Sequence, residues 1–164
     1  MLLIKNASPA DIALIRSLTM QVWPQTYTPI LGDTQVQYML NRFYASEVLE
    51  QQMNSGQQFI ICYADDWPSA FAAFEKMDTD TFKLHKIYIL PEHQGKGIGK
   101  FIISHIAVHM SSIGANKLRL NVNRYNYPAI AFYNKAGFIN IGDEDIDIGD
   151  GYFMNDHMLE LKIS

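Results

Sequence analysis

The spacing of hydrophobic residues predicts helices in the first part of the chain. A helix is expected to begin at Ser8-Pro9, with Ser8 as the N-cap and Pro9 in the first turn, where its missing N–H breaks no hydrogen bond. Because the residue before a proline avoids the helical region, we expect this helix to end at Trp23-Pro24, and residues 26–33 to form a turn-rich connection. Its inward positions recur every three or four residues: Ile12, Ile15, Leu18 and Val22.

Runs of β-branched and aromatic residues alternate with helical patterns over the rest of the chain. The order β-α-α-α-β-β-β-α-β-α-β-β predicts a mixed α/β (α+β) sheet protein. Strands are predicted at residues 2–5, 58–64, 69–77, 81–90, 117–123, 138–148 and 152–163, and further helices at 34–44, 46–55, 97–110 and 128–135.

Length and composition indicate one globular domain over residues 1–164. The 164 residues are 48% hydrophobic and 18% charged, which provides enough apolar material for a core. The apolar runs are too short for a membrane span, and the first residues lack the basic and apolar regions of a signal peptide. Cys62 is the only cysteine, so no disulfide can form within the chain, and we expect a cytoplasmic protein.

The charges are unevenly distributed. The net charge of -4 argues against nucleic acid or an anionic membrane as a partner. Nine of the 13 Lys and Arg residues lie between Lys76 and Lys135, whereas residues 136–161 hold none and carry seven acids. The basic middle suits an anionic ligand; the acidic stretch suits a cationic ligand or is simply a solvated surface.

A glycine-rich turn between a predicted strand and helix carries the strongest chemical signal. Gly95, Gly97 and Gly99 alternate within residues 94–100, so a ligand can approach the backbone closely. The free amides of the following helix's first turn, its dipole, and Lys96 favour a pyrophosphate there. The spacing fits neither a Walker A loop nor the G-x-G-x-x-G dinucleotide fingerprint.

Two motifs resemble those of one family, the GCN5-related N-acetyltransferases (GNAT). Residues 94–99, Gln-Gly-Lys-Gly-Ile-Gly, resemble its motif A, Q/R-x-x-G-x-G/A. Residues 126–138 resemble its N-x-x-A-x-x-x-Y-x-x-x-G-F signature at every fixed position, with one helix and one strand between the motifs. The resemblance implies a mostly antiparallel central sheet flanked by helices, and the segment order is similar to that of bacterial spermine/spermidine acetyltransferases.

The resemblance also implies an acetyl-CoA site. In relatives, the glycine turn holds the pyrophosphate, the edge of the preceding strand pairs with the pantetheine arm, an asparagine contacts the cofactor, and a tyrosine lies near the sulfur. The corresponding residues of this sequence are Ile87, Tyr88, Ile89, Gln94, Gly95, Lys96, Gly97, Ile98, Gly99, Lys100, Asn126 and Tyr133.

Acetylation of an amine needs a base for the ammonium proton, a donor for the oxyanion and a proton for the thiolate. Tyr133 occupies the family's tyrosine position and is the predicted general acid, and an amide near Ile89 is the expected oxyanion donor. His85 is the predicted general base, on a strand face that alternation would give it in common with Lys83 and Ile87. A histidine without a role and a water relay are the alternatives.

The expected acceptor is a primary amine of a small molecule, with a polyamine as one candidate. Relatives admit the acceptor between the first helices and the last strands. Here Trp23 and Tyr27 would cover methylene groups, and Asp143 and Asp145 would hold ammonium groups. A protein or peptide amine, or a non-catalytic module that only binds acyl-CoA, are the alternatives, and a homodimer is a further expectation.

Three other patterns point away from metal or thiol chemistry. Cys62 lies inside an apolar strand and is interpreted as a core residue. His105 and His109 share a helix face without a third ligand. Residues 143–147 start like a calcium loop but lack its glycine and glutamate. We therefore expect no metal site.

Overall fold

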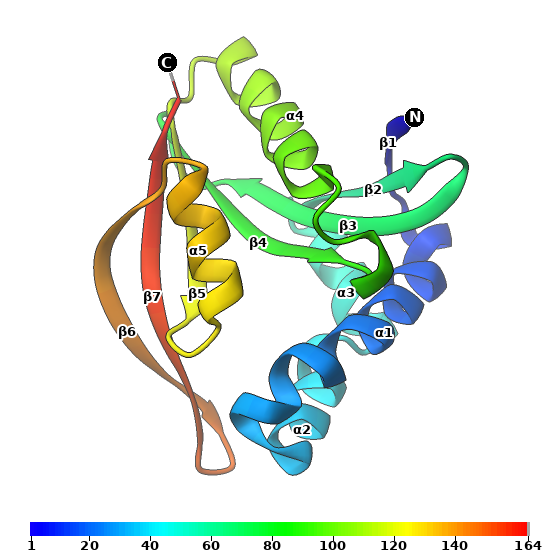
Figure 1. Ribbon diagram of the computed structural model, residues 1–164, viewed down its shortest axis with the longest axis vertical. Helices are drawn as coiled ribbons and strands as arrows, with labels where there is room; N and C mark the ends of the chain where they lie inside the picture. The colour runs from blue at the N-terminus through cyan, green and yellow to red at the C-terminus, as the bar shows by residue number, and fades with distance from the viewer. Residues whose placement is uncertain (164) are drawn as a thin grey trace.

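The computed structural model describes residues 1–163 and has the predicted order of helices and strands (Figure 1). Its seven-stranded sheet has the order β1-β2-β3-β4-β5-β7-β6, and only β4 and β5 are parallel. The mixed, mostly antiparallel α/β fold is therefore confirmed. The strands are β1 (Leu2–Asn6), β2 (Gln58–Ala64), β3 (Trp67–Lys76), β4 (Thr81–Ile89), β5 (Lys117–Asn123), β6 (Ile139–Gly149) and β7 (Tyr152–Lys162). The helices are α1 (Ile12–Leu31), α2 (Asp33–Phe43), α3 (Ser46–Asn54), α4 (Ile98–Ser112) and α5 (Tyr127–Lys135).

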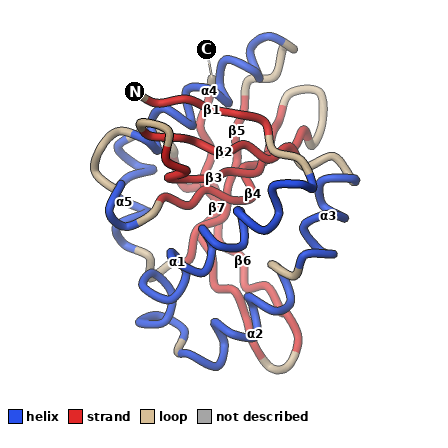
Figure 2. The backbone as a smooth tube through the Cα atoms, turned by 90° about the vertical axis from the view of Figure 1, so that its right-hand side faces the viewer, coloured by secondary structure: helices blue, strands red, loops and turns tan. Residues whose placement is uncertain are grey.

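Helices cover both faces of the sheet, and each face has its own core (Figure 2). On one face, α4 and α5 pack over a cluster that includes Phe82, Ile102 and Leu118. On the other face, α1, α2 and α3 pack over a cluster that includes Ile15 and Phe71. None of the helices in residues 1–163 has the length and apolar character needed to cross a membrane.

The sheet opens between its two parallel strands. Residues 81–83 of β4 pair with residues 117–119 of β5, and no further pairs join these strands within the described residues. Figure 1 shows β4 and β5 diverging beyond that point. The edge of β4 that faces β5 is therefore left with unpaired backbone groups over its second half, where a ligand with amide groups can add as a strand would.

The first helix continues past its expected end. α1 runs through Pro24 and Pro29 to Leu31, so the predictions of an end at Trp23-Pro24 and of a turn-rich connection after it are wrong. Trp23 is only 4% exposed, and its burial against the sheet offsets the cost of the interrupted hydrogen bond. Because the helix continues, Trp23, Tyr27 and Leu31 recur every four residues and lie on one face.

A β-bulge interrupts the alternation of side chains along β4. The register between β3 and β4 passes from Lys86 directly to Leu84, which makes His85 the extra residue. As a result, Ile87 packs in the core beneath α4, whereas Lys83 and His85 border a cavity on the side of α1. The prediction that Lys83, His85 and Ile87 share a face is therefore wrong.

Candidate functional site

The glycine-rich turn joins β4 to α4 and presents a row of free amides. Gly95 and Gly97 have φ angles of 76° and 82°, in the left-handed region, and a Cβ at either position would meet nothing within 4 Å. Within the described residues, no amide from Gly95 to Lys100 donates a hydrogen bond to the protein. These amides, the N-terminus of the 15-residue helix α4 and the charges of Lys96 and Lys100 fit a pyrophosphate.

Gly99 serves a different purpose from the other two glycines. A Cβ on Gly99 would lie 2.7 Å from Cζ of Phe132 and 3.3 Å from Cδ1 of Ile89. The missing side chain of Gly99 therefore allows α4 to pack closely against α5, while its backbone amide stays free within the described residues.

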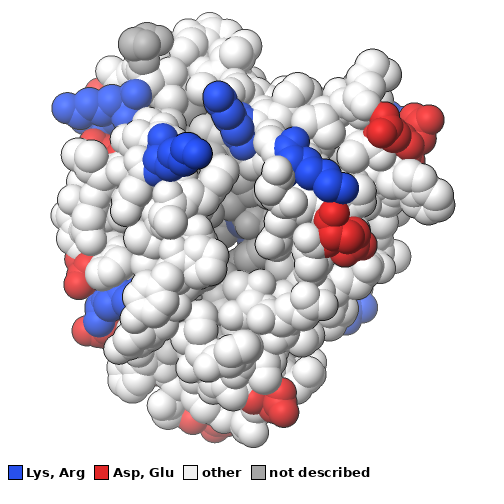
Figure 3. Space-filling view, in the orientation of Figure 1, with Lys and Arg blue, Asp and Glu red and all other residues white. Residues whose placement is uncertain are grey.

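Basic residues and a hollow mark the surface beside this turn. In Figure 3, Lys and Arg side chains gather on the upper half of the face that carries α4 and α5, and the surface is hollowed below them. Ile87, Tyr88 and Ile89 lie on β4 beyond its last pair with β5. The Gln94 side-chain amide donates to the Ile89 carbonyl at 3.1 Å, which holds the turn against the end of the strand.

Asn126 and Tyr133 belong to the start and the body of α5, which covers the same face of the sheet as α4. Asn126 is buried and is the N-cap of α5, because its side-chain oxygen accepts a hydrogen bond from Ala129 N at 3.4 Å. Tyr133 packs edge-on between Phe132 and Phe138, with ring centroids 5.4 Å away. Burial raises the pKa of Tyr133, so its hydroxyl stays protonated.

A cavity of about 290 Å³ lies between β4, β5, the first residues of β7 and helices α1–α3, and we call it the aromatic cavity. Trp23 is central to its wall, with ring centroids 4.5 Å from Tyr27, 5.3 Å from Tyr44 and 5.9 Å from Tyr88. Burial raises the pKa of all three tyrosines, which keeps their hydroxyls neutral. The residues lining it are Trp23, Tyr27, Leu31, Met39, Phe43, Tyr44, Gln52, Gln57, Lys83, Leu84, His85, Lys86, Tyr88, Asn121, Asn123, Ile146, Phe153, Met154 and Asp156.

The cavity wall carries one carboxylate and several basic groups. Asp156 is 6% exposed and accepts a hydrogen bond from Asn121 at 3.3 Å; burial raises its pKa. Nε2 of His85 lies 2.9 Å from Oε1 of Glu75, and burial lowers the pKa of His85 below 6.5. Burial also lowers the pKa of Lys86, to about 8.

Tyr88 lies both on the part of β4 beyond its last pair with β5 and in the wall of the aromatic cavity. Its hydroxyl is 3.4 Å from that of Tyr27. Across the cavity, Asp156 of β7 pairs with Asn123 of β5, whose carbonyl accepts a hydrogen bond from Asn126 N at 3.0 Å. The aromatic cavity therefore adjoins the residue that caps α5.

The structure does not bring Asp143 and Asp145 into the cavity. Both are exposed and lie beside Arg124, with the Asp145 contact at 2.7 Å, and Asp143 also contacts His157 at 2.6 Å. Side chains alternate along β6, so the residues that face the cavity side are Ile146 and Ile148 instead. The acid that lines the cavity is Asp156 of β7, one of the seven acids in residues 136–161, which no sequence motif singles out.

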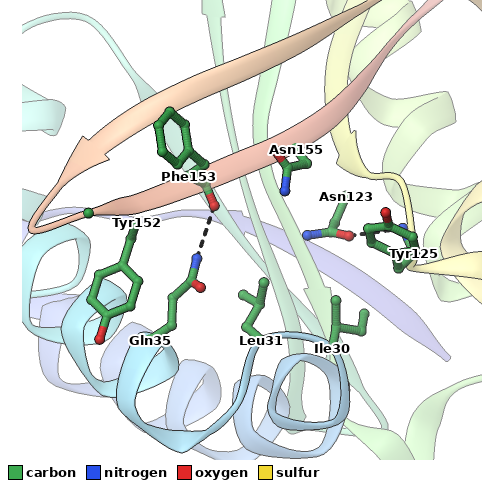
Figure 4. Close-up of a pocket in the computed structure, with 9 residues that line it drawn as sticks. Ile30, Leu31, Gln35, Asn123, Tyr125, Tyr152, Phe153 and Asn155 are labelled. Carbon is green, nitrogen blue, oxygen red and sulfur yellow. Dashed lines mark hydrogen bonds between the residues drawn. The ribbon is translucent and has the colours of Figure 1, made fainter.

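A second pocket of about 310 Å³, the outer pocket, adjoins the aromatic cavity (Figure 4). The two share Leu31, Asn123 and Phe153 in their walls. Gln35 donates to the Phe153 carbonyl at 3.0 Å across the outer pocket, as Figure 4 shows. Its lining is uncharged: Ile30, Leu31, Gln35, Asn123, Tyr125, Gly151, Tyr152, Phe153 and Asn155.

No group of three or more His, Cys, Asp or Glu residues able to hold a metal ion occurs in residues 1–163. Cys62 is buried in the core beneath α4, and burial raises the pKa of its thiol. Cys62 is therefore a core residue and takes no part in the site.

Comparison with known proteins identifies the family. The profile of the acetyltransferase (GNAT) family matches residues 18–138. The spermidine N(1)-acetyltransferase of Thermoplasma acidophilum is 26% identical over 140 residues, which cover 82% of this chain and 86% of that protein. The [ribosomal protein bS18]-alanine N-acetyltransferase of Salmonella typhimurium is 31% identical over 87 residues, which cover 52% and 58%.

A solved structure shows the same fold over the whole length. The PaiA N-acetyltransferase of Thermoplasma acidophilum, in complex with coenzyme A, has a TM-score of 0.83 and 24% identity, and 99% of each chain is covered. Together with the glycine turn, the open edge of β4 and the family profile, these likenesses show that the chain belongs to the GNAT family and is an N-acetyltransferase that uses acetyl-CoA.

Proposed function

We propose that this chain, as one domain over residues 1–164, transfers the acetyl group of acetyl-CoA to a primary amine of a small molecule. The observation that carries the proposal is the arrangement about β4. The glycine turn and the free strand edge lie at the end of β4, and the aromatic cavity with buried Asp156 lies against the same part of β4 at Tyr88, whose hydroxyl is 3.4 Å from that of Tyr27. Bound acetyl-CoA supplies a thioester whose carbonyl carbon the amine attacks, so that an N–C bond forms and the C–S bond breaks.

The donor side is built mainly from backbone. The amides of Gly95, Lys96, Gly97, Ile98, Gly99 and Lys100 would hold the pyrophosphate, and the two lysines would add charge. The edge of β4 at residues 87–89 would pair with the amides of the pantetheine arm. The side-chain oxygen of Asn126 is used as a helix cap, which leaves its NH₂ group to contact the cofactor.

The acceptor side combines a carboxylate with aromatic rings. Asp156 would attract the ammonium form of the amine, and Trp23 and Tyr27 would cover its methylene groups. The buried position of Asp156 strengthens that attraction, because little water screens it. Asp143 and Asp145 take no part, since Arg124 contacts both of them outside the cavity.

The amine must lose a proton before it attacks, and His85 is suited to take one. With Nε2–H donated to Glu75, the lone pair of Nδ1 is left to accept. His85 precedes Ile89 by four residues of strand, roughly 13 Å, so the proton would pass through water. Tyr133, protonated because of its burial, would donate to the departing thiolate.

A polyamine acceptor is the narrower form of this proposal. The Thermoplasma relative is named for spermidine, and the aromatic walls suit an aliphatic chain. Asp156 is the only carboxylate in the wall of the aromatic cavity within the described residues, which matches one ammonium group rather than several. A cytoplasmic location and a homodimer stay predictions beside it.

The test is amine-dependent release of thiol from acetyl-CoA, measured with a panel of polyamines, alkylamines, amino acids and short peptides. We expect small amines to give release above the rate without amine. Asp156→Asn should lower kcat/KM for such an amine at least about 30-fold, the size expected for a buried charge contact, whereas Asp143→Asn should change it less than twofold. Release with peptides only, or none that depends on amine, would contradict the proposal.

A further inference from the structure

Lys86 is a buried ammonium group that the chemistry above leaves without a role. It lies on the β4 wall of the aromatic cavity and is 8% exposed. Its Nζ donates to Oε1 of Gln52 at 2.9 Å and lies 5.7 Å from the ring centroid of Tyr44 and 5.5 Å from that of Phe59. No carboxylate of residues 1–163 forms an ion pair with it. Neutral amide oxygens and rings leave most of the cost of burying this charge uncompensated.

Trp23, between Tyr27 and Tyr44 in the cavity wall, adds a second buried donor. Its indole Nε1–H has no hydrogen-bond partner within the described residues, although the side chain is only 4% exposed. The centroid of the indole ring lies 5.3 Å from that of the Tyr44 ring, and Nζ of Lys86 lies 5.7 Å from the same Tyr44 centroid. Buried donors in folded proteins are normally satisfied, so a bound acceptor group is the expected partner.

Asp156 carries the opposite charge on another wall of the same cavity. It comes from β7 and makes no ion pair within residues 1–163. Its pairing partner on β5 is Asn123, whose carbonyl accepts a hydrogen bond at 3.0 Å from N of Asn126, the cap of α5 on the side where the thioester is expected. Asp156 therefore lies toward the reacting end of the cavity, and Lys86 lies toward Gln52 of α3. Trp23 lies between them, with its ring 4.5 Å from that of Tyr27 and 5.3 Å from that of Tyr44.

We propose that the acceptor is a zwitterion, an amine that also carries a carboxylate or a similar anionic group, and that Lys86 and the Trp23 indole N–H bind this anionic group while Asp156 attracts the amine. The proposal rests on the acetyl transfer proposed above and specifies its substrate. Spermidine, which has no anionic group, would then be a poorer acceptor than a carboxylated amine of similar length.

The experiment compares matched acceptors. Amino acids with one to five carbons between amine and carboxylate are each assayed against the alkylamine with the same number of carbons, with spermidine included, by release of thiol from acetyl-CoA. The wild-type protein is compared with Lys86→Met, with Trp23→Phe, which keeps a ring but removes the donor, and with Lys76→Met, a lysine at the exposed end of β3.

We expect at least one amino acid to exceed its alkylamine at least 30-fold in kcat/KM, a ratio typical of a buried charge contact. Lys86→Met should abolish that preference by lowering only the amino-acid value, Trp23→Phe should reduce it several-fold, and Lys76→Met should leave it unchanged. If Lys86→Met fails to fold, the preference for the amino acid over its alkylamine in Trp23→Phe decides whether the inference holds.

The inference would be overturned, with the proposed function left standing, if matched pairs were turned over equally or if spermidine were preferred. It would also be overturned if a preference for the amino acid persisted in both Lys86→Met and Trp23→Phe. Turnover of no small amine at all would overturn both proposals together.

Discussion

Tyr133 is the residue whose role is most easily separated from its packing. Tyr133→Phe keeps the ring contacts with Phe132 and Phe138 but removes the hydroxyl that would protonate the thiolate. We expect kcat to fall about 100-fold, within the range for loss of a general acid, with the KM for acetyl-CoA changed little. Steady-state kinetics and a melting curve measure both. An unchanged kcat in a folded variant would remove Tyr133 from the mechanism.

His85 makes a prediction about pH. Its neutral form is the base, and burial lowers its pKa, so the neutral form persists below pH 6.5 and the acid limb of kcat/KM should lie below that value. His85→Gln should remove the limb and lower kcat/KM at least about tenfold at neutral pH. A loss of less than about threefold, with the acid limb retained, would assign the proton transfer to water or to another group.

At the residue scale, the sequence predicts chemistry better than orientation. The motifs single out Gly97, Asn126 and Tyr133, which are the N-cap of α4, the N-cap of α5 and a buried residue of α5. The sequence could not show which acids of β6 and β7 point into the cavity, because that depends on which face of each strand packs against the core. Asp156 and Lys86 are buried without an ion-pair partner in the described residues, and no sequence pattern signals that.

Among the elements, the contact of α4 with α5 depends on one missing side chain. In Gly99→Val, the new methyl groups would collide with Phe132 and Ile89. We expect the free energy of unfolding to fall by about 1–3 kcal/mol, the usual cost of overpacking, measured by denaturant titration. Phe132→Ala in the same chain should recover part of this loss, because it vacates the space. Gly99→Val with wild-type stability would refute the packing role.

The end of α1 shows why element boundaries were harder to predict than elements. The rule for residues before proline favours an end at Trp23, yet the helix continues for eight residues. Burial of Trp23 against the sheet outweighs the local preference, and only the assembled core reveals it. In the same way, the bulge at His85 arises from the register with β3, which the sequence of β4 alone does not contain.

For the molecule as a whole, a buried unpaired Lys86 should cost stability. Its pKa in the folded state, about 8, lies below its unfolded value of 10.5, so the folded state loses its proton first as the pH rises. The free energy of unfolding should therefore rise between pH 8 and 10.5 relative to Lys86→Met. At pH 7, Lys86→Met should be more stable by up to ~3 kcal/mol.

Denaturant titrations of both proteins at pH 7, 9 and 10.5 measure that difference. His85, Lys83 and Glu75 lie nearby on the same strands, and they are unchanged in both proteins, so their titration cancels in the comparison to first order. Equal stability of the two proteins at pH 7, with no pH-dependent difference, would show that the charge of Lys86 is compensated in the folded protein.

The central claim is that the bare amides of the glycine turn bind the diphosphate of coenzyme A, and titration calorimetry with coenzyme A tests it most directly. Gly97 has a φ of 82°, so Gly97→Asn, which tolerates that conformation, is the control for Gly97→Glu, which adds a negative charge beside the diphosphate. The account predicts binding by the wild-type protein, affinity within about fivefold for Gly97→Asn, and a loss of at least about 100-fold for Gly97→Glu. No binding by the wild-type protein, or undiminished binding by Gly97→Glu, would contradict it.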